Sequence, residues 1–291
     1  MTQRETSGPA SSVDIGPPAP TDPLVPATEL PTTDLSGTER RRRDLGRPLS
    51  ALVVLVLLVL WWVLTSGTET IDPLYFPTPE SLWEAVTTLD TQLLDDARAT
   101  LWRVLVSWIS GSALGVGVGL LMARARWLFH VLNPVIEAVR PVPPVALIPF
   151  VILWFGIGDN GKIFLGALAC FMVMVVNTTV ACGNVSPVYV QAARSLGASR
   201  NQVYRTVVLP AIVPEILSGF RIGSALAFAV VVAAEFQGAD EGIGRLIMSA
   251  SRTLNTSVVL LGTIVIAILA VALDLLISRI SAHVTRWSAN R

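Results

Sequence analysis

The sequence predicts an all-α, polytopic membrane protein with six transmembrane helices, and its composition, its apolar runs and the placement of its arginines each support this fold class. Hydrophobic residues make up 52% of the 291 residues and charged residues only 14%, with a mean hydropathy of +0.63. Soluble domains are far less apolar. Several runs approach the roughly 20 apolar residues that a helix needs to cross a hydrocarbon core about 30 Å thick.

The N-terminal stretch, residues 1–47, is predicted to be a disordered tail. It is rich in Pro, Ser, Thr and Asp and has no apolar period, so it cannot bury enough surface to offset the entropy of ordering. The basic run Arg40–Arg43 precedes an apolar stretch, but no small-residue cleavage site follows Trp61 and Trp62. We therefore expect a retained membrane anchor rather than a cleaved signal, and a transmembrane domain over residues 48–291.

The first predicted crossing is Leu49–Thr65, which ends in a pair of tryptophans of the kind found at membrane interfaces. The second is Leu101–Met122. This run contains four glycines that predict a small-residue face for close helix packing. They are Gly111, Gly115, Gly117 and Gly119.

The third predicted crossing, Val135–Phe155, is rich in proline, so its backbone hydrogen-bond ladder must be broken. The prolines are Pro141, Pro143, Pro144 and Pro149. The last three fit a pathway-lining element and a packing kink about equally well. The remaining predicted crossings are Ile163–Ala181, Ile212–Ala234 and Val258–Leu276.

Arginine placement predicts the orientation of the helices. Six crossings put both termini on one side, and arginines from several connecting segments fall on that same side. They are Arg40–Arg43, Arg124, Arg126, Arg194, Arg200, Arg205, Arg279 and Arg286. By the positive-inside rule this side is the cytosol.

The sequence offers little for metal binding or for ATP binding. Cys170 and Cys182 would lie about 18 Å apart on one helix, too far to pair, and His130 and His283 are isolated. Residues 156–162 nearly spell a phosphate-binding P-loop, but Ile163 replaces its Ser or Thr, and no strand is expected before it. We therefore expect no metal site and no ATPase activity in this chain.

The most informative segment is the connection between the fourth and fifth crossings, residues 186–210. Ser186 is placed to cap a helix that begins at Pro187 and runs to Leu196, and Gly197 supplies a left-handed stop. Ser199 and Gln202 then form a capping-box pair for a second helix. That helix is expected to continue until Leu209 and Pro210 return the chain to the membrane.

This segment resembles the EAA signature of ABC importer permeases, in which Glu-Ala-Ala, a glycine and a Leu-Pro pair recur at fixed spacing. The matching residues are Gln191, Ala192, Ala193, Gly197, Val207, Leu209 and Pro210. The resemblance implies that this is the coupling helix, which sits in a groove of a cytosolic ATPase subunit. Gln191 departs from the family's glutamate, so the side chain at this position can hydrogen-bond but carries no charge.

The resemblance extends over about Phe76 to Trp287 and is closest to the nitrate, sulfonate and taurine branch of the family. The segments that resemble this branch are Phe76–Pro79, Arg140–Pro144, the Gly156-Ile157-Gly158 run and the Ala234-Glu235 pair. It implies a bacterial inner-membrane permease, a homodimer that works with two ATPase subunits carrying ATP and Mg. An extracytoplasmic binding protein would deliver a small anionic solute, although the branch also hosts importers of aromatic acids, bicarbonate and neutral pyrimidine-like compounds. Nucleic acid is not an expected partner.

Four polar residues in or near the apolar runs have competing interpretations. Glu235 at the end of the fifth crossing fits a solvated carboxylate or a contact with a gate or binding protein, and Asn177 fits an interhelix bond or a solute contact. Arg221 and Asp274 are costly in a membrane unless they are paired or reach the interface, and snorkelling to the interface is the favoured interpretation.

Two other functional classes remain as alternatives. An ion-gradient-driven secondary transporter would show repeated halves and buried central charges, and neither is evident in the sequence. A membrane scaffold would use the connection at residues 186–210 to bind a partner other than an ATPase.

Overall fold

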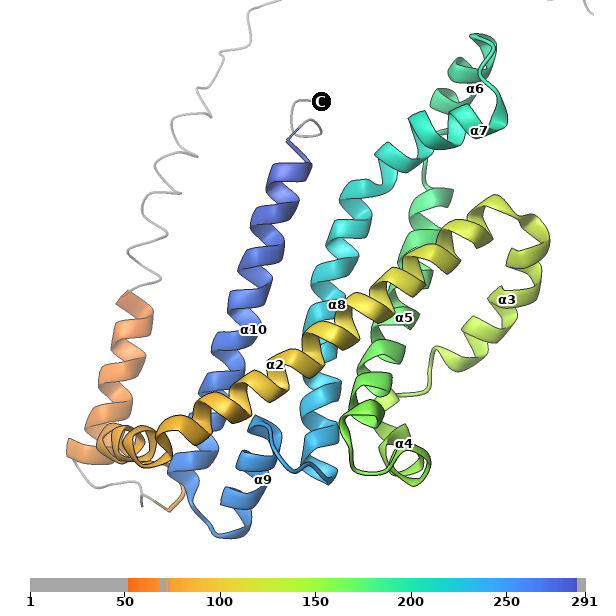
Figure 1. Ribbon diagram of the computed structural model, residues 1–291. Coiled ribbons are helices and arrows are strands. Elements are labelled where there is room, and N and C mark those ends of the chain that lie inside the picture. The colour runs from red at the N-terminus through yellow and green to blue at the C-terminus, as the bar shows by residue number, and fades with distance from the viewer. Residues whose placement is uncertain (1–51, 68–71, 73, 287–291) are drawn as a thin grey trace, which may run out of the picture. The chain divides into compact units, whose positions relative to one another are not determined.

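The computed structural model of the chain describes residues 52–67, 72 and 74–286 (Figure 1). The chain divides into two compact units, Met1–Leu58 and Val59–Arg291. In the first unit only residues 52–58 are described, and they are helical and exposed. The predicted tail, residues 1–47, lies outside the described residues. Throughout the described ranges every regular element is a helix, as the sequence predicts.

Within the described residues, four helices are long and apolar enough to cross a membrane. They are α2 (Pro79–Arg124), α5 (Asp159–Gly183), the helix Arg200–Gln237 and α10 (Thr256–Val284). Helix α3 (Arg126–Val139) and the pair η2 (Pro144–Leu147) and α4 (Ile148–Phe155) are apolar enough only when taken together, and they are bent by 81° at the break between them, the geometry of a broken span or of a re-entrant loop. The break predicted from the prolines is therefore confirmed.

The apolar helix Leu52–Ser66 corresponds to the first predicted crossing and ends in a π-helical turn, η1 (Val63–Gly67). Its described length falls short of a full membrane span, so a sixth crossing stays a prediction. Trp61 Nε1 donates to the carbonyl of Pro77 at 3.1 Å, and Ser66 Oγ donates to the Glu80 carboxylate at 2.8 Å.

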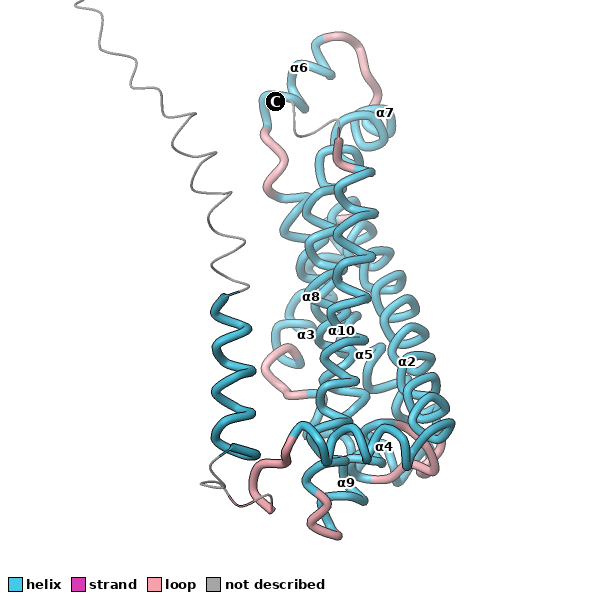
Figure 2. The backbone as a smooth tube through the Cα atoms, turned by 90° about the vertical axis from the view of Figure 1, so that its left-hand side faces the viewer, coloured by secondary structure: helices cyan, strands magenta, loops and turns pink. Residues whose placement is uncertain are grey.

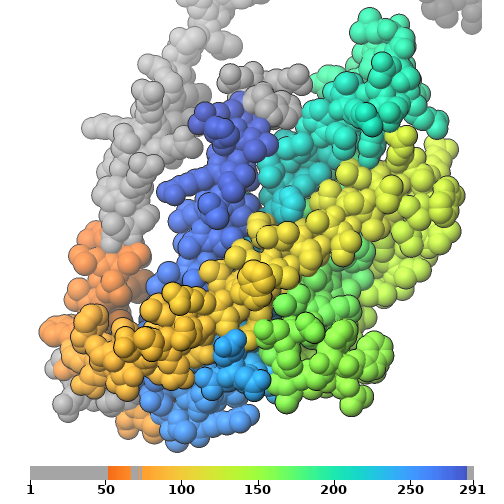
Figure 3. Space-filling model, in the orientation of Figure 1, coloured from red at the N-terminus to blue at the C-terminus, as the bar shows by residue number. Residues whose placement is uncertain are grey.

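Helix α2 begins well before the predicted crossing. Thr78 caps it by accepting a hydrogen bond from the Ser81 N–H, and Pro79 occupies a favoured first position. The helix is kinked at Asp90, which has a φ of 36°, and then continues to Arg124. The stretch Pro79–Arg124 therefore combines an additional helical segment with the predicted crossing. Figure 3 shows α2 running across one face of the molecule.

Glycines of α2 allow close packing against α5. A Cβ added at Gly115 would lie 2.7 Å from the Met174 Cβ, and one added at Gly119 would lie 2.8 Å from the Thr178 Cβ. Gly111 faces α5 in the same way, whereas nothing lies within 4 Å of a Cβ at Gly117. The small-residue face is confirmed for three glycines spaced one helical turn apart, and Gly117 points away from it.

The sequence predicted that the second helix of the connection ends at Leu209 and Pro210, but in the structure this helix continues past Pro210. Helix α7 (Arg200–Val203) passes into a π-helical turn, η3 (Tyr204–Val208), and then into α8 (Leu209–Gln237). The Leu209 N–H donates to the carbonyl of Tyr204, five residues earlier, and this wider turn precedes Pro210, which has no N–H to donate. The second half of the connection, from Arg200 on, is therefore helically continuous with a membrane span.

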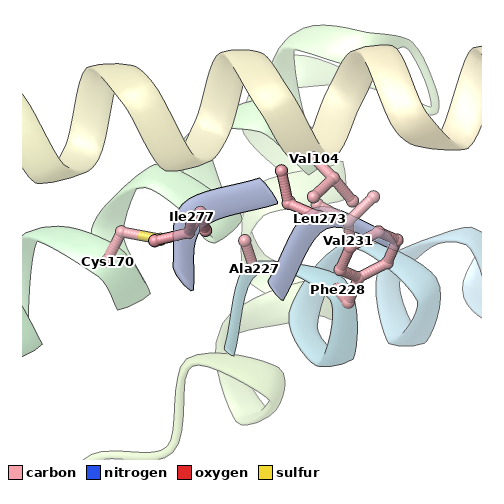
Figure 4. Packing of buried hydrophobic residues seen from close by; sticks show 7 residues of the cluster. All are labelled: Val104, Cys170, Ala227, Phe228, Val231, Leu273 and Ile277. Carbon is pink, nitrogen blue, oxygen red and sulfur yellow. The ribbon is translucent and has the colours of Figure 1, made fainter. Parts of the chain in front are cut away.

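A main core cluster is formed by residues from α2, α5, α8 and α10 (Figure 4). Its members are Val104, Cys170, Ala227, Phe228, Val231, Leu273 and Ile277. Both cysteines are free, and Cys170 fills this core as a small apolar residue.

The spans place two groups of short elements at opposite ends of the second unit (Figures 1 and 2). Helices α6 (Pro187–Ser195) and α7 lie at one end, near the junction between α2 and α3, and we name it the α6 end. Helices α9 (Ile243–Arg252) and α4 lie at the other, which we name the α9 end.

Candidate functional site

The connection at the α6 end is held in one shape by its own backbone. Gly197 has a φ of +82°, a conformation that glycine adopts without steric cost. Its N–H donates to the Arg194 carbonyl at 2.9 Å, and the Ala198 N–H donates to the Ala193 carbonyl at 3.1 Å. These two bonds form a Schellman motif, which confirms the predicted stop after α6.

The second half of the connection is capped as predicted. Ser199 Oγ accepts from the Gln202 N–H at 3.4 Å, and Gln202 Oε1 accepts from the Ser199 N–H at 2.8 Å. The prediction for Ser186 was wrong in detail, because its side chain makes no capping bond to α6. Tyr204 OH donates to the Leu120 carbonyl at 3.1 Å and thereby ties the connection to α2.

Helix α6 presents apolar side chains outward. Val188 and Tyr189 are exposed, and Leu196 is 88% exposed. Gln191 and Ala192 are exposed, as a contact surface requires. Exposed apolar groups gathered on a short helix are typical of a protein interface.

Leu209 and Pro210 differ from the other signature residues in their position. Both lie half-buried at the start of α8, beyond the exposed part of the connection. They support the membrane end of the connection, whereas Gln191 and Ala192 lie on its surface.

A buried ion-pair network at the α9 end centres on Arg103 of α2, which is 2% exposed. Its Nη1 donates to Glu235 Oε1 at 2.7 Å and to the Glu241 carbonyl at 2.8 Å. Its Nε donates to Asp159 Oδ1 at 2.7 Å, and its Nη2 lies 3.5 Å from the Glu241 carboxylate. One guanidinium thus joins α2 to α5, to α8 and to the segment that precedes α9.

The N-terminus of α9 is capped by side chains from other helices rather than by its own. Three successive backbone N–H groups donate to acceptors on α2 and α8. The donors are Gly242, Ile243 and Gly244, which bond respectively to Asp96, Thr100 and Glu235 at 2.6, 2.9 and 2.8 Å. Carboxylates are favourable here because the N-terminal end of a helix carries a partial positive charge.

Two glycines make this close approach possible. Gly242 has a φ of +123°, and a Cβ there would lie 2.6 Å from the Glu235 carboxylate and 2.7 Å from Arg103 Nη1. A Cβ at Gly244 would lie 2.6 Å from the Cβ of Glu235. Larger residues at either position would displace the carboxylate.

Lys162 belongs to the margin of the same network. Its ammonium is buried, donates to the carbonyls of Ile157 and Gly158, and lies 4.0 Å from Asp159 Oδ1. The lysine of the P-loop-like stretch is therefore bonded to its own loop rather than presented to a phosphate group.

The four predicted pathway residues do not converge on one site. Pro143 is exposed and Pro144 half-buried at the break before η2. Asn177 lies toward the α6 end of α5, where its Nδ2 donates to the Glu215 carbonyl of α8 at 2.9 Å. Glu235 lies at the α9 end and is buried and paired with Arg103, not solvated.

Arg221 and Asp274 pair with each other. Arg221 Nε and Nη2 donate to the two oxygens of Asp274 at 2.8 and 2.7 Å, which joins α8 to α10. The predicted snorkelling is therefore replaced by a bidentate pair, the strongest geometry open to these two groups.

Sequence reasoning missed Arg103, Asp159 and the capping residues of α9. One signal was available, since Asp96, Thr100 and Arg103 lie four and three residues apart and so share one face of a helix. Three polar groups on one face of an apolar helix indicate polar partners on its neighbours.

Comparisons with known proteins agree with this architecture. Residues 115–288 match the family model described as binding-protein-dependent transport system inner membrane component. The chain is 38% identical over 260 residues to the taurine transport system permease protein TauC of Escherichia coli (strain K12), covering 85% of this chain and 94% of that protein. It is 34% identical to the putative aliphatic sulfonates transport permease protein SsuC of the same organism, covering 79% of this chain and 89% of that protein.

Among solved structures, the fold resembles a chain of the inward-facing MetNI methionine ABC transporter, with a TM-score of 0.56 and 21% identity, covering 68% of this chain and 98% of that chain. At that identity the likeness concerns the fold alone. The family match and the two relatives carry the assignment. The chain belongs to the binding-protein-dependent transport system inner membrane component family and is a multi-pass ABC importer permease of the taurine and sulfonate branch.

Proposed function

We propose that this permease forms the pathway for a small anionic solute, and that α6 couples the pathway to a separate cytosolic ATPase. The observation that carries the proposal is the exposed apolar surface of α6, held rigid by the Schellman motif at Gly197. The surface would sit in a groove of the ATPase subunit. ATP and Mg would be bound by that partner and not by this chain.

Continuity of the helix provides the mechanical link. Because α7, η3 and α8 form one uninterrupted helix, movement of the connection is transmitted to a membrane span rather than absorbed by a hinge. Movement of two ATPase subunits toward each other would displace α8 and switch the pathway between outward and inward access. Leu209 and Pro210 lie at the point where this force enters the membrane.

The proposed orientation places the α6 end in the cytosol. Arg124, Arg126, Arg194, Arg200 and Arg205 all belong to elements at this end, as the positive-inside rule requires. Both termini would be cytosolic if the helix Leu52–Ser66, with its undescribed preceding residues, completes a sixth crossing. The α9 end would then face the binding protein.

The names of the relatives support a sulfonate-like solute, since they refer to taurine and aliphatic sulfonates. Arg103, Lys162 and Arg245 at the α9 end are already paired with carboxylates. The solute's charge would therefore be met by neutral donors, for which the Asn177 side-chain amide is the candidate, whereas Pro143 and Pro144 have no N–H to donate and would only shape the pathway.

A second copy of the chain would complete the pathway. Helix α4 exposes Phe150, Leu153 and Trp154, an apolar surface that lipid covers in a single copy and that a second copy would cover in a dimer. Pairing of two copies would bury such surfaces and present two α6 helices, one to each subunit of an ATPase dimer.

The coupling role can be tested by replacing Gly197 with valine. A β-branched residue is strained at a φ of +82°, so we expect the Schellman motif to be lost and uptake to fall at least about tenfold while the chain stays in the membrane. Uptake, ATP hydrolysis and co-purification of the ATPase would be measured together. Gly183→Ala is the matched control, because nothing lies within 4 Å of a Cβ at that position and its φ is not positive.

Normal uptake in Gly197→Val would contradict the proposal. The rival function, an ion-gradient-driven transporter, gains some support from Arg221 and Asp274, charges that lie inside membrane spans. Uptake in ATP-free vesicles driven by an ion gradient, with no ATPase co-purifying, would favour that rival.

A further inference from the structure

A hollow of about 640 Å³ opens at the α6 end, where α2 meets α3 and the connection folds back over both. Four of its lining residues are arginines contributed by four different elements. They are Arg124 of α2, Arg126 of α3, Arg194 of α6 and Arg200 of α7. No lining residue is acidic, and the other lining residues include Val190, Val203 and Tyr204.

These arginines lack acidic partners within the part of the chain that the structure describes. None of the ion pairs between described residues includes any of the four. Arg124 Nη1 donates to the neutral Asn201 Oδ1 at 3.3 Å, and its guanidinium lies 5.5 Å from the centre of the Tyr204 ring. Four like charges around one hollow repel one another unless an anion compensates them.

The positive-inside rule explains why arginines lie at this end, but it does not explain why they converge. The rule acts on the number of basic residues in a connecting segment and does not depend on their arrangement in the folded chain. Arg205 illustrates the difference, since it belongs to the same connection, is exposed and does not line the hollow. Convergence from four elements is typical of a site that binds an anion.

The position of the hollow indicates which anion is available. The apolar part of α2 ends at Ala123, immediately before Arg124. Trp127 follows Arg126 and is 70% exposed, and tryptophan is enriched at the level of lipid headgroups. The hollow therefore opens at the depth where phospholipid phosphates lie, and guanidinium groups bind phosphate oxygens in a bidentate manner.

We propose that this hollow binds the headgroup of an anionic phospholipid, with the four arginines contacting its phosphate. The bound lipid would neutralise the cluster and hold the α2–α3 junction against α6 and α7. The site shares α6 with the proposed coupling surface, through Val190 and Arg194, but includes none of the proposed pathway residues, and its occupancy does not depend on the direction or energy source of transport.

The test uses the full-length chain, purified with any subunits that accompany it and placed in nanodiscs of phosphatidylcholine with a minor fraction of phosphatidylglycerol. Lipid retained by the protein is measured by native mass spectrometry. Arg126→Gln and Arg200→Gln are each expected to weaken phosphatidylglycerol retention about fivefold, the effect of one basic residue near a membrane surface. Arg205→Gln is the matched control and should leave retention unchanged.

Two outcomes would overturn the proposal. Equal loss of retention in Arg205→Gln would mean that general surface charge attracts the lipid, and unchanged retention in Arg126→Gln and Arg200→Gln would mean that the hollow does not hold it. Inorganic phosphate serves as a competing probe that distinguishes the source of the anion. Displacement of phosphatidylglycerol by millimolar phosphate would show a site for a free soluble anion and would also count against a lipid.

Discussion

Arg103 shows how a charged side chain can be accommodated in a membrane helix. Its guanidinium is bonded to Glu235, Asp159 and Glu241 and has almost no exposed surface. Burial of each charge is costly, so removing one partner leaves the others without compensation. The network is therefore more sensitive to the loss of one member than to the loss of an oppositely charged pair.

We predict that Arg103→Met destabilises the purified permease by about 3–5 kcal/mol, the cost of breaking a buried ion pair by removing one partner. The measurement is unfolding in detergent, monitored by circular dichroism. The double variant Arg103→Met with Glu235→Met should recover part of this loss, because it removes both charges of the 2.7 Å pair.

Arg98→Gln is the control for Arg103→Met. Arg98 is 79% exposed and forms only a 3.6 Å pair with Asp95 on its own helix, so its loss should have little effect. If Arg103→Met were as stable as Arg98→Gln, the network would contribute nothing to folding.

The pair of Arg221 and Asp274 gives a second prediction at the residue scale. Arg221→Asp and Asp274→Arg should each lower the amount of folded protein in the membrane, because each replaces the 2.7 Å ion pair between two spans by two like charges. The variant that carries both changes should restore most of it by re-forming the pair in reverse. The measurements are the abundance of the protein in the membrane and the amount of monodisperse protein after detergent extraction. If the variant with both changes did not recover the abundance, the orientation of the pair would matter as well as its charge.

At the residue scale the sequence predicted local contacts better than distant ones. The Ser199–Gln202 capping box and the Gly197 stop involve neighbours along the chain, so side-chain chemistry alone was enough to predict them. The partners of Glu235 were not predictable in this way, since Arg103 lies 132 residues earlier and only the packing of α2 against α8 brings the two together.

The packing of α2 against α5 gives a prediction at the scale of an element. Gly115→Leu should destabilise the permease strongly and lower its yield, because even a Cβ would lie 2.7 Å from Met174 and 2.8 Å from the Phe171 carbonyl. Thermal unfolding of the purified protein is the measurement.

Gly117→Ala is the comparison for Gly115→Leu, on the same helix and two residues away. Nothing lies within 4 Å of a Cβ there, and alanine is the better helix former, so stability should stay equal or rise slightly. Comparable losses in both variants would mean that glycine flexibility, rather than close packing, is what α2 needs.

Helix boundaries were the least predictable feature of the elements. Apolar content located every long span, but α2 begins at Pro79 because polar residues continue the helix beyond the apolar run. Pro210 suggested an end, yet the π-helical turn at Tyr204–Val208 lets α8 continue from α7. Hydropathy reports where a helix meets lipid and carries no information on how far the helix extends beyond it.

For the whole molecule, the helical fold and the family were both predictable from the sequence. The resemblance at Gln191–Pro210 pointed to an ABC importer permease, and the family match over residues 115–288 confirms it. The number of crossings was less predictable. Six were predicted from the sequence, and the described residues contain four long spans and one bent pair. The remaining crossing depends on residues that precede Leu52.

The order of the network along the chain has a consequence for the synthesis of the protein. Arg103 enters the membrane with α2, its partner Asp159 follows 56 residues later, and Glu235 follows 132 residues later. At about 5–20 residues per second, the ribosome needs roughly 7–26 s to supply Glu235. During that time the nascent chain holds a guanidinium that is only partly neutralised. Helix α5 is therefore the first of these helices available to pair with Arg103 and α8 the second, and a chain truncated before α8 would be left with an incompletely paired charge for quality-control proteases to recognise.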